Sequence, residues 1–217
     1  DADAIIGEAI RGVMPGEAVS RALAGRSFGP GRLALLAVGK AAWEMASAAW
    51  EALGPQIGEG LVITKYGHAR GPIGGFRIRE AGHPVPDGAS FAATREAVLL
   101  AEGLGEGDTL LFLLSGGGSA LFEEPLIPPE ELEDVTRQLL ASGADIVEMT
   151  TVRKRLSAVK GGRFARICAP ARVVSVVLSD ILGDPLDMIA SGPAAPDPST
   201  CAQALAVAER YGLALSP

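Results

Sequence analysis

The sequence is poor in cysteine, histidine and aromatic residues. Its 217 residues contain two cysteines and two histidines, and aromatic residues make up 5% of the chain. Cys168 and Cys201 cannot form a disulfide framework, so we expect a reducing, cytoplasmic compartment. Neither His68 nor His83 has another histidine or a cysteine at ligand spacing, which argues against a structural zinc site.

Long apolar runs are also missing. No segment reaches the ~18 apolar residues that a membrane-spanning helix needs. The first residues lack the cationic segment of a secretory signal peptide. There is no internal repeat at periods of about 20–50 residues and no long linker, so we expect one continuous domain over residues 1–217.

Acidic residues are absent from one stretch of an otherwise acidic chain. The net charge of −7 (26 Asp and Glu against 19 Lys and Arg) argues against a nucleic-acid or anionic-membrane partner. Residues 149–179 contain no Asp or Glu but seven of the 19 cations, so this stretch carries +7 and the rest −14. The seven are Arg153, Lys154, Arg155, Lys160, Arg163, Arg166 and Arg172. Because solvated helices usually mix charges, this pattern favours a segment around an anionic ligand over a solvated cationic face.

What is present is an alternation of short apolar runs with longer helical segments. The predicted strands are residues 33–38, 61–64, 76–80, 109–114 and 172–178. The predicted helices are residues 4–23, 40–53, 90–103, 130–142, 152–168 and 200–211, with Ser90 as an N-cap. Such alternation predicts an α/β fold with a mostly parallel sheet.

In parallel α/β sheets, ligands bind beyond the carboxyl ends of the strands. One such end carries two serines around three glycines: Ser115, Gly116, Gly117, Gly118 and Ser119. Glycines allow close backbone approach, and the N–H groups and hydroxyls favour a phosphate or carboxylate. The alternative is a tight strand–helix turn without a ligand. Leu121 replaces the third glycine of the dinucleotide-binding fingerprint.

Lys40 follows the strand at residues 33–38. It is not part of a Walker P-loop, because Ala34 and Ala41 replace the glycine and the hydroxyl residue of that motif. Lys40 is therefore either a solvated lysine at a helix start or a cation directed at a transferring phosphoryl group.

Two aspartates follow the strand at residues 172–178. A carboxylate just past a buried strand is well placed to hold Mg²⁺ or to accept a hydroxyl proton. Asp180 is the first candidate and Asp184 the second. The alternative is that both cap turns around Gly183 and Pro185.

The basic stretch has helical spacing. Arg153, Ser157, Lys160 and Phe164 would share one face of the predicted helix 152–168. Gly161 and Gly162 would weaken that helix by ~1 kcal/mol each, which is easier to explain if a ligand approaches the backbone. Of the two histidines, we expect His68 to be solvent-exposed in a glycine-rich loop and His83 to lie in a rigid turn.

Five segments in order resemble one known family. They are VGKAA at 38–42, AGHPVPD at 81–87, LLSGGGSALFEEP at 113–125, TVRKRLSAVKGGRFA at 151–165 and SDILGDPLDMIASGPAAPDPST at 179–200. Together they resemble the bacterial glycerate 2-kinase family, whose second domain is called MOFRL and some of whose members have been labelled hydroxypyruvate reductase.

The resemblance implies a Rossmann-like three-layer sandwich as the amino-terminal domain of a two-domain kinase. Such a kinase transfers the γ-phosphoryl group of ATP to the 2-hydroxyl of D-glycerate with Mg²⁺, giving 2-phosphoglycerate. Lys40 matches the lysine proposed as catalytic in the family, and residues 116–119 match its glycine loop. The family's basic motifs match Arg153, Lys154 and Lys160. Family members continue for roughly as many residues again, and the MOFRL domain, with an arginine proposed as catalytic, is not in this chain.

These features combine into one hypothesis with two alternatives. Lys40 would stabilise the transferring phosphoryl group, and Asp180 would hold Mg²⁺ or act as base, with Asp184 as a second metal ligand. The glycine loop, the basic residues and His83 would bind the nucleotide phosphates or glycerate. The alternatives are a hydroxypyruvate reductase, which needs a nicotinamide site, and a non-catalytic domain that binds a sugar phosphate.

Overall fold

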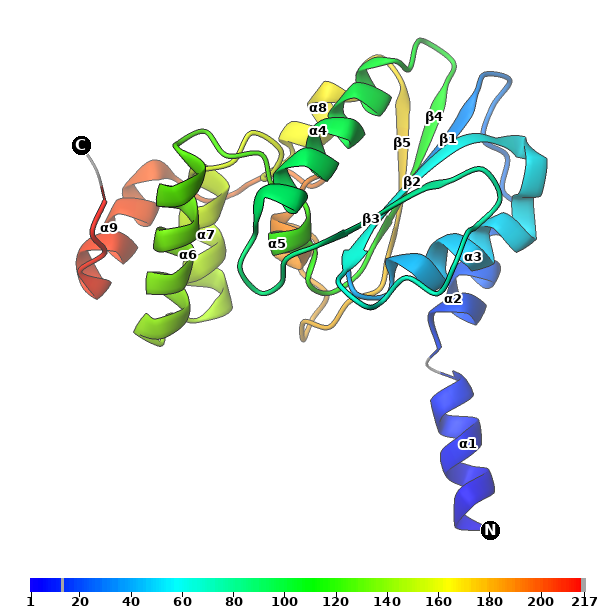
Figure 1. Ribbon diagram of the computed structural model, residues 1–217, viewed down its shortest axis with the longest axis horizontal. Helices are drawn as coiled ribbons and strands as arrows, with labels where there is room; N and C mark the ends of the chain where they lie inside the picture. Colours follow the sequence, from blue (N-terminus) through cyan, green and yellow to red (C-terminus); the bar gives the residue numbers. More distant parts are fainter. Residues whose placement is uncertain (13, 216–217) are drawn as a thin grey trace.

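A five-stranded parallel sheet organises the protein. The computed structural model describes residues 1–12 and 14–215 (Figure 1). The strands are β1 (Leu33–Val38), β2 (Ile57–Lys65), β3 (Arg77–Ala81), β4 (Thr109–Leu114) and β5 (Arg172–Val177). They lie in the order β3-β2-β1-β4-β5, and every neighbouring pair is parallel. The predicted α/β fold with a mostly parallel sheet is confirmed.

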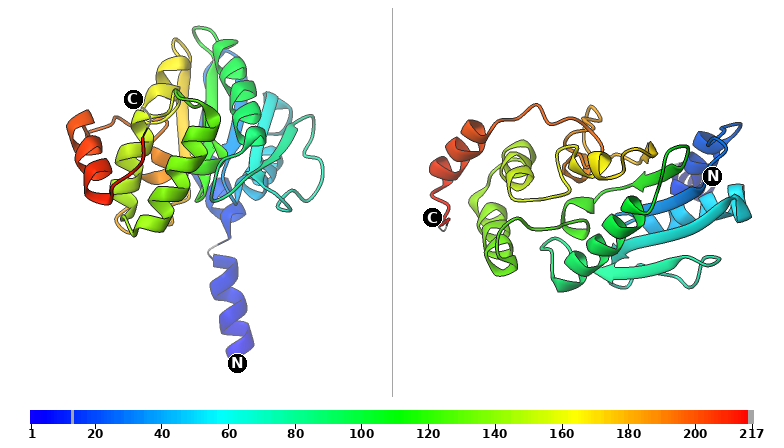
Figure 2. Two further views of the ribbon diagram at one scale, coloured as in Figure 1. Left: turned by 60° about the vertical axis from the view of Figure 1, so that its left-hand side comes forward. Right: turned by 90° about the horizontal axis from the view of Figure 1, so that it is seen from above.

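Helices cover both faces of this sheet, which makes the sandwich three-layered (Figure 2). The helices are α1 (Ala2–Gly12), α2 (Pro15–Leu23), α3 (Ala42–Leu53), α4 (Gly88–Glu102), α5 (Gly118–Leu121), α6 (Pro129–Ser142), α7 (Ile146–Arg155), α8 (Arg163–Ile167) and α9 (Cys201–Tyr211). Two short 3₁₀ turns, η1 (Gly54–Gln56) and η2 (Ile189–Ser191), complete the elements. In the described part of the chain, no helix is long and apolar enough to cross a membrane.

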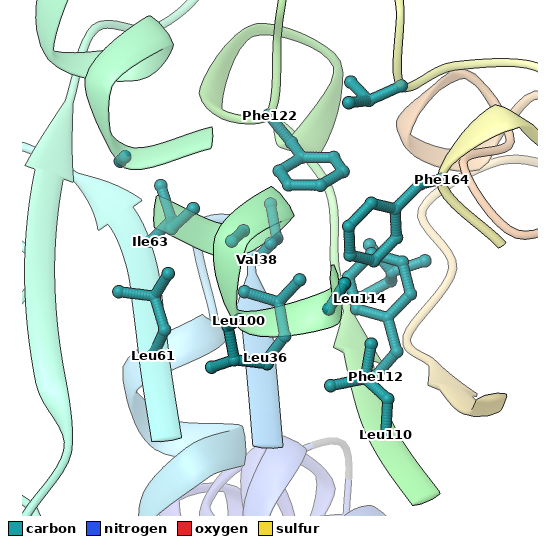
Figure 3. Packing of buried hydrophobic residues seen from close by; sticks show 14 of the residues in the cluster. Leu36, Val38, Leu61, Ile63, Leu100, Leu110, Phe112, Leu114, Phe122 and Phe164 are labelled. Carbon is teal, nitrogen blue, oxygen red and sulfur yellow. The ribbon is translucent and has the colours of Figure 1, made fainter. Parts of the chain in front are cut away.

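The two central strands, β1 and β4, are apolar except for Thr109, because both of their faces are buried. All six residues of β1 and all six of β4 are buried. Alternate side chains contribute to two cores: Leu36 of β1 packs with α4 and α8 on one face, and Leu35 packs with α2 and α3 on the other. Figure 3 shows the first core, in which the rings of Phe112, Phe122 and Phe164 lie with centroids 4.9–5.9 Å apart.

A third, smaller core lies beside the sheet. It joins α6, α7 and α9 through Val135, Leu139, Val152, Ala204 and Val207. In the left view of Figure 2, these helices lie on the side of β5 and away from β3. The long segment between β5 and α9 therefore connects the sheet to this helical group, and Asp180 lies near its start.

Two predicted helices are each divided in the structure. The predicted helix 4–23 becomes α1, which extends away from the sheet in Figure 1, and α2, which begins at Pro15 because proline suits the first turn of a helix. The prediction of one continuous helix over residues 152–168 is wrong, because α7 ends at Arg155 and α8 begins only at Arg163. Between them Gly161 and Gly162 have φ of +60° and +78°, a left-handed conformation that an α-helix interior does not contain.

Ser90 is not the N-cap of α4. That position belongs to Asp87, whose side chain accepts from the Ser90 backbone N–H, while the Ser90 hydroxyl accepts from the Asp87 N–H. The two residues form a reciprocal capping box, so the helix begins two residues earlier than predicted.

Two adjacent leucines of α4 provide a test of this packing. Leu100 is 5% exposed in the core of Figure 3, whereas its neighbour Leu99 is 68% exposed. We expect Leu100→Ala to lower the free energy of unfolding by about 2–5 kcal/mol, because the cavity removes buried contacts. The matched control Leu99→Ala should change it by less than about 0.5 kcal/mol in urea unfolding. Equal effects of the two substitutions would contradict the orientation of α4.

Candidate functional site

Three strand ends meet at one edge of the sheet, as parallel strands require. Lys40 follows β1, the glycine loop at residues 115–119 follows β4, and Asp180 follows β5. The Lys40 Nζ lies 3.9 Å from the Asp180 Oδ2, and both side chains are about half exposed. The structure thus brings together the lysine, the loop and the first aspartate, as expected from the sequence.

The glycine loop is in contact with the charged groups. A Cβ added at Gly116 would overlap the Asp180 carboxylate. At Gly117, where φ is +89°, a Cβ would lie 3.1 Å from both the His83 Nε2 and the Lys40 Cγ. Side chains at these two positions would displace the groups that surround the loop. The glycines therefore let three ionisable side chains approach one backbone segment.

The two serines of the loop have internal partners. Ser115 is buried, and its Oγ accepts from the Ala41 N–H at 3.1 Å. The Lys40 N–H donates to the Gly116 carbonyl at 2.9 Å, so the loop and the start of α3 are bonded twice. The Ser119 Oγ lies 2.8 Å from the Ser191 Oγ. Both serines thus stabilise the shape of the loop.

A cavity of about 710 Å³ adjoins the loop. Its inner wall is polar and includes His83, Gly116, Ser119, Arg153 and Asp180. Its outer wall is mainly apolar and comprises Leu140, Ile146, Val147, Met149, Ile181, Leu182 and Met188. Lys40 lines two smaller cavities next to it, of about 550 and 220 Å³. The edge of the sheet therefore offers space for a ligand that is charged at one end and apolar at the other.

His83 is half-buried in the wall of this cavity. Burial lowers the pKa of His83, and the nearby cations Lys40, Lys65 and Arg153 lower it further. The imidazole is therefore neutral at pH 7 and can both donate and accept a hydrogen bond.

His68 is not the solvent-exposed residue that we expected. It is half-buried, and its Nδ1 lies 3.1 Å from the Lys40 carbonyl. Its backbone N–H donates to the Glu80 carboxylate at 3.0 Å, which fixes the loop after β2. The glycine-rich composition around His68 predicted an exposed loop. The sequence did not indicate the contact with Lys40, because that residue is 28 positions away in the chain.

Of the three basic residues that match the family's motifs, Arg153 lines the cavity, whereas Lys154 and Lys160 are buried in internal ion pairs. Arg153 lines the cavity, and its Nη2 donates to the Ser119 carbonyl at 2.7 Å. The Lys154 Nζ is fully buried 3.1 Å from Asp187 and 3.2 Å from Asp197. Carboxylates from elsewhere in the chain thus neutralise Lys154, which does not line the cavity in the described part of the chain.

Lys160 is neutralised in the same way. Its Nζ lies 2.5 Å from the Glu123 Oε2, and both side chains have no exposed surface. Burial lowers the pKa of Lys160 to about 8, and the attraction of Glu123 opposes this shift. The side chains of Lys154 and Lys160 are thus fully buried, which contradicts the prediction that they face an anionic ligand. Arg153 and Lys160 also do not share a helix face, because α7 ends before Lys160.

Only one of the two predicted metal ligands faces the cavity. Asp180 lines it, whereas Asp184 is exposed in a turn where its φ is +51°. Over residues 1–12 and 14–215, no cluster of three or more His, Cys, Asp and Glu side chains could hold a metal ion. A complete protein cage for Mg²⁺ is thus not formed by these described residues, and Asp180 is the predicted metal ligand that lines the cavity.

Comparison with known proteins identifies the family of the chain. A family model described as "Domain of unknown function (DUF4147)" matches residues 1–217. The chain belongs to the DUF4147 family. The resemblance to glycerate 2-kinases is confirmed as well: this DUF4147 chain is 55% identical over 214 residues to the D-glycerate 2-kinase of Thermotoga maritima, covering 98% of the chain and 51% of that protein.

Other relatives extend the comparison. A glycerate 2-kinase of Pyrococcus horikoshii is 39% identical over 96% of the chain and 49% of its own length. A protein of Agrobacterium vitis named putative hydroxypyruvate reductase is 45% identical over 85% of the chain and 42% of its own length. The crystal structure of the Thermotoga maritima glycerate kinase matches with a TM-score of 0.91 and 54% identity, covering 99% of this chain and 52% of that one. The DUF4147 chain thus spans about half the length of the curated relatives it matches.

The electrostatic contact between His83 and Lys40 can be tested by histidine NMR. We expect the pKa of His83 to lie below its usual 6.5, and Lys40→Met to raise it because a nearby positive charge is removed. The His68→Gln variant assigns the signals, since the chain has two histidines. The exposed cation Arg137 provides a control, Arg137→Met, which should leave the pKa unchanged. A His83 pKa at or above 6.5 would contradict the structure.

Proposed function

We propose that this chain supplies the phosphoryl-transfer site of a glycerate 2-kinase, which moves the γ-phosphoryl group of ATP to the 2-hydroxyl of D-glycerate. The observation that carries the proposal is the convergence of Lys40, the glycine loop and Asp180 at one sheet edge, with the Lys40 Nζ 3.9 Å from Asp180. Relatives named D-glycerate 2-kinase and glycerate 2-kinase support the choice of reaction.

Phosphoryl transfer depends mainly on alignment and on neutralising charge. Lys40 has a half-exposed ammonium at the end of a flexible side chain, while its backbone is fixed by the Gly116 carbonyl. It can therefore follow the negative charge of the phosphoryl oxygens from ATP to the acceptor hydroxyl. Arg153 would add a second positive charge from the wall of the cavity.

Asp180 would act on the acceptor hydroxyl or hold the metal. Its carboxylate is half exposed and touches the glycine loop, so it can accept the proton of the 2-hydroxyl as the oxygen attacks. Mg²⁺ is usually held by one or two carboxylates together with phosphates and waters, and Asp180 fits that pattern, whereas Asp184 lies outside the cavity. When bound, the ion would neutralise charge on the nucleotide phosphates.

His83 and the apolar outer wall would contribute to binding. Neutral His83 can hydrogen-bond to a hydroxyl or a carboxylate of the small substrate. Leu182 is fully exposed and Val147 is 49% exposed at the rim of the cavity. The relatives contain a further part that this chain does not span, and we propose that a corresponding domain closes the cleft over these residues. We also propose that the whole enzyme is soluble and cytoplasmic.

The name of the Agrobacterium vitis relative favours one rival function, the reduction of hydroxypyruvate. The glycine loop argues against it, because Leu121 replaces the third glycine of the dinucleotide fingerprint and is fully buried in the core. Full-length protein incubated with hydroxypyruvate and NADH should leave the NADH unconsumed. With D-glycerate and Mg–ATP it should form a phosphoglycerate whose ³¹P NMR signal is that of the 2-isomer.

The role of Lys40 predicts a large loss of rate without a loss of fold. In the full-length protein, Lys40→Met should lower kcat by about 10²–10³-fold, because one donor to the developing charge is removed. Thermal unfolding should change little, since the side chain is half exposed. The control Arg137→Met, on the surface of α6, should keep the kcat of the wild type. A near-normal kcat for Lys40→Met would exclude this residue from the chemical step.

The contact between the glycine loop and Asp180 predicts a steric effect. Gly116→Ala should displace the Asp180 carboxylate, because the new methyl group overlaps it. We expect a decrease in kcat/KM of about 100-fold, the size of effect that a displacement of ~1 Å can cause. Gly75→Ala is the matched control, since a Cβ there has open space around it. Equal kcat/KM for both alanine variants would mean that the position of Asp180 does not matter.

A further inference from the structure

The helix α3, which follows Lys40, begins without a capping side chain of its own. Its N-cap is Ala41, whose methyl group cannot accept a hydrogen bond. The glycine loop holds this helix start instead. The Ser115 Oγ accepts from the Ala41 N–H at 3.1 Å, and the Gly116 carbonyl accepts from the Lys40 N–H at 2.9 Å. These two bonds fix the amide side of Lys40 and leave its carbonyl to another partner.

That partner is His68, in the loop of residues 66–76 between β2 and β3. The His68 Nδ1 lies 3.1 Å from the Lys40 carbonyl oxygen. Because a carbonyl oxygen can only accept, Nδ1 carries the proton, and the Nε2 of the neutral ring is then an acceptor. The backbone of Lys40 is therefore bonded on both sides, through its N–H to the glycine loop and through its carbonyl to His68.

A carboxylate on the sheet fixes the position of His68 in turn. The Glu80 Oε1 accepts from the backbone N–H groups of His68 and Ala69, each at 3.0 Å. The His68 N–H is shared with the Lys65 carbonyl, also at 3.0 Å. Since Glu80 belongs to β3, which pairs with β2, these bonds tie the loop to the sheet.

Two further contacts join the same loop to the first turn of α3. The Trp43 Nε1 donates to the Gly71 carbonyl at 2.8 Å, and the Arg70 guanidinium forms an ion pair of 3.3 Å with Glu44. The same guanidinium lies over the Trp43 ring, 5.8 Å from its centroid. The loop between β2 and β3 therefore packs along the start of the helix that follows the lysine.

We propose that His68 is a positioning residue for phosphoryl transfer: its Nδ1–H holds the Lys40 carbonyl, so that the Lys40 ammonium reaches the phosphoryl group from a fixed backbone. The proposal rests on the kinase function proposed above. The Lys40 side chain is about half exposed, so its reach depends on where its backbone lies. A lysine on a displaced backbone would still attract the phosphates but would meet the transition state in a poorer position.

Two amide substitutions separate the position of the donor from the presence of a polar side chain. The Nδ2 of asparagine can replace the histidine Nδ1, whereas the Nε2 of glutamine replaces the histidine Nε2. In the full-length protein, we expect His68→Gln to lower kcat by about tenfold, because Lys40 keeps only its bond to the glycine loop. The KM values for Mg–ATP and D-glycerate should stay within about twofold, since the lost interaction acts in the transition state. His68→Asn should keep most of the wild-type kcat, and equal losses in both variants would overturn the proposal.

A double-mutant cycle tests whether His68 acts through Lys40. In the Lys40→Met background, His68→Gln should cause less than about a twofold further loss of kcat, because no ammonium is left to position. Additive losses would overturn the proposal. Tyr66→Phe is the matched control in the same loop, since the Tyr66 hydroxyl donates to the Asp87 carboxylate at 2.9 Å and not to the start of α3. It should keep the wild-type kcat, and a loss as large as that of His68→Gln would also overturn the proposal.

The tautomer of His68 distinguishes a failure of this inference from a failure of the kinase function. Side-chain ¹⁵N NMR of the full-length protein without substrates, at a pH where the ring is neutral, should show His68 protonated on Nδ1 and unprotonated on Nε2. The signals that vanish in His68→Asn identify this ring. A ring protonated on Nε2 would overturn the positioning role whether or not the protein is a kinase. A wild-type protein with the Nδ1–H tautomer but no glycerate phosphorylation would overturn only the proposed function.

Discussion

The parallel pairing of β1 with β4 holds Lys40 and the glycine loop together at one edge of the sheet. The register joins Val38 to Leu114, and the pairing continues past both strands: the Ser115 N–H donates to the Val38 carbonyl and the Lys40 N–H to the Gly116 carbonyl, each at 2.9 Å. Lys40 therefore cannot move away from the glycine loop unless the sheet edge opens. On the other side of β4, the Leu178 N–H donates to the Leu114 carbonyl at 2.8 Å and directs the chain toward Asp180.

The charge distribution of the folded protein differs from that of the chain. Residues 149–179 contain no acidic residue, yet carboxylates from other segments neutralise two of their lysines, both of which are buried. Asp187 and Asp197 come from the segment after β5, and Glu123 from the segment after α5. Since a buried charge without a partner is costly, these contacts join the helical group to the sheet. Arg153 is the cation that this arrangement leaves at the cavity.

A strained turn lies behind the glycine loop. Ala190 and Ser191 have φ of +52° and +62°, which is uncommon for residues with a side chain. The turn is held because the Gly161 N–H donates to the Ser191 carbonyl and the Gly162 N–H to the next carbonyl, at 3.1 and 2.7 Å. The glycines of the basic segment thus serve an internal backbone contact. Strain of this kind is often retained next to functional sites, and here it places Ala190 against the loop at Gly118.

The sequence by itself determined the parallel α/β fold and the meeting of Lys40, the glycine loop and Asp180. Apolar strand runs are local signals, and parallel strands bring their carboxyl ends to one edge whatever the rest of the chain does. Only the tertiary structure decided which cations of the basic stretch face the cavity, because Lys154 and Lys160 meet carboxylates 33–43 residues away in the chain. It also decided where the basic helix ends. Helical spacing describes a periodic backbone, and the left-handed φ of Gly161 and Gly162 depends on the distant turn that binds them.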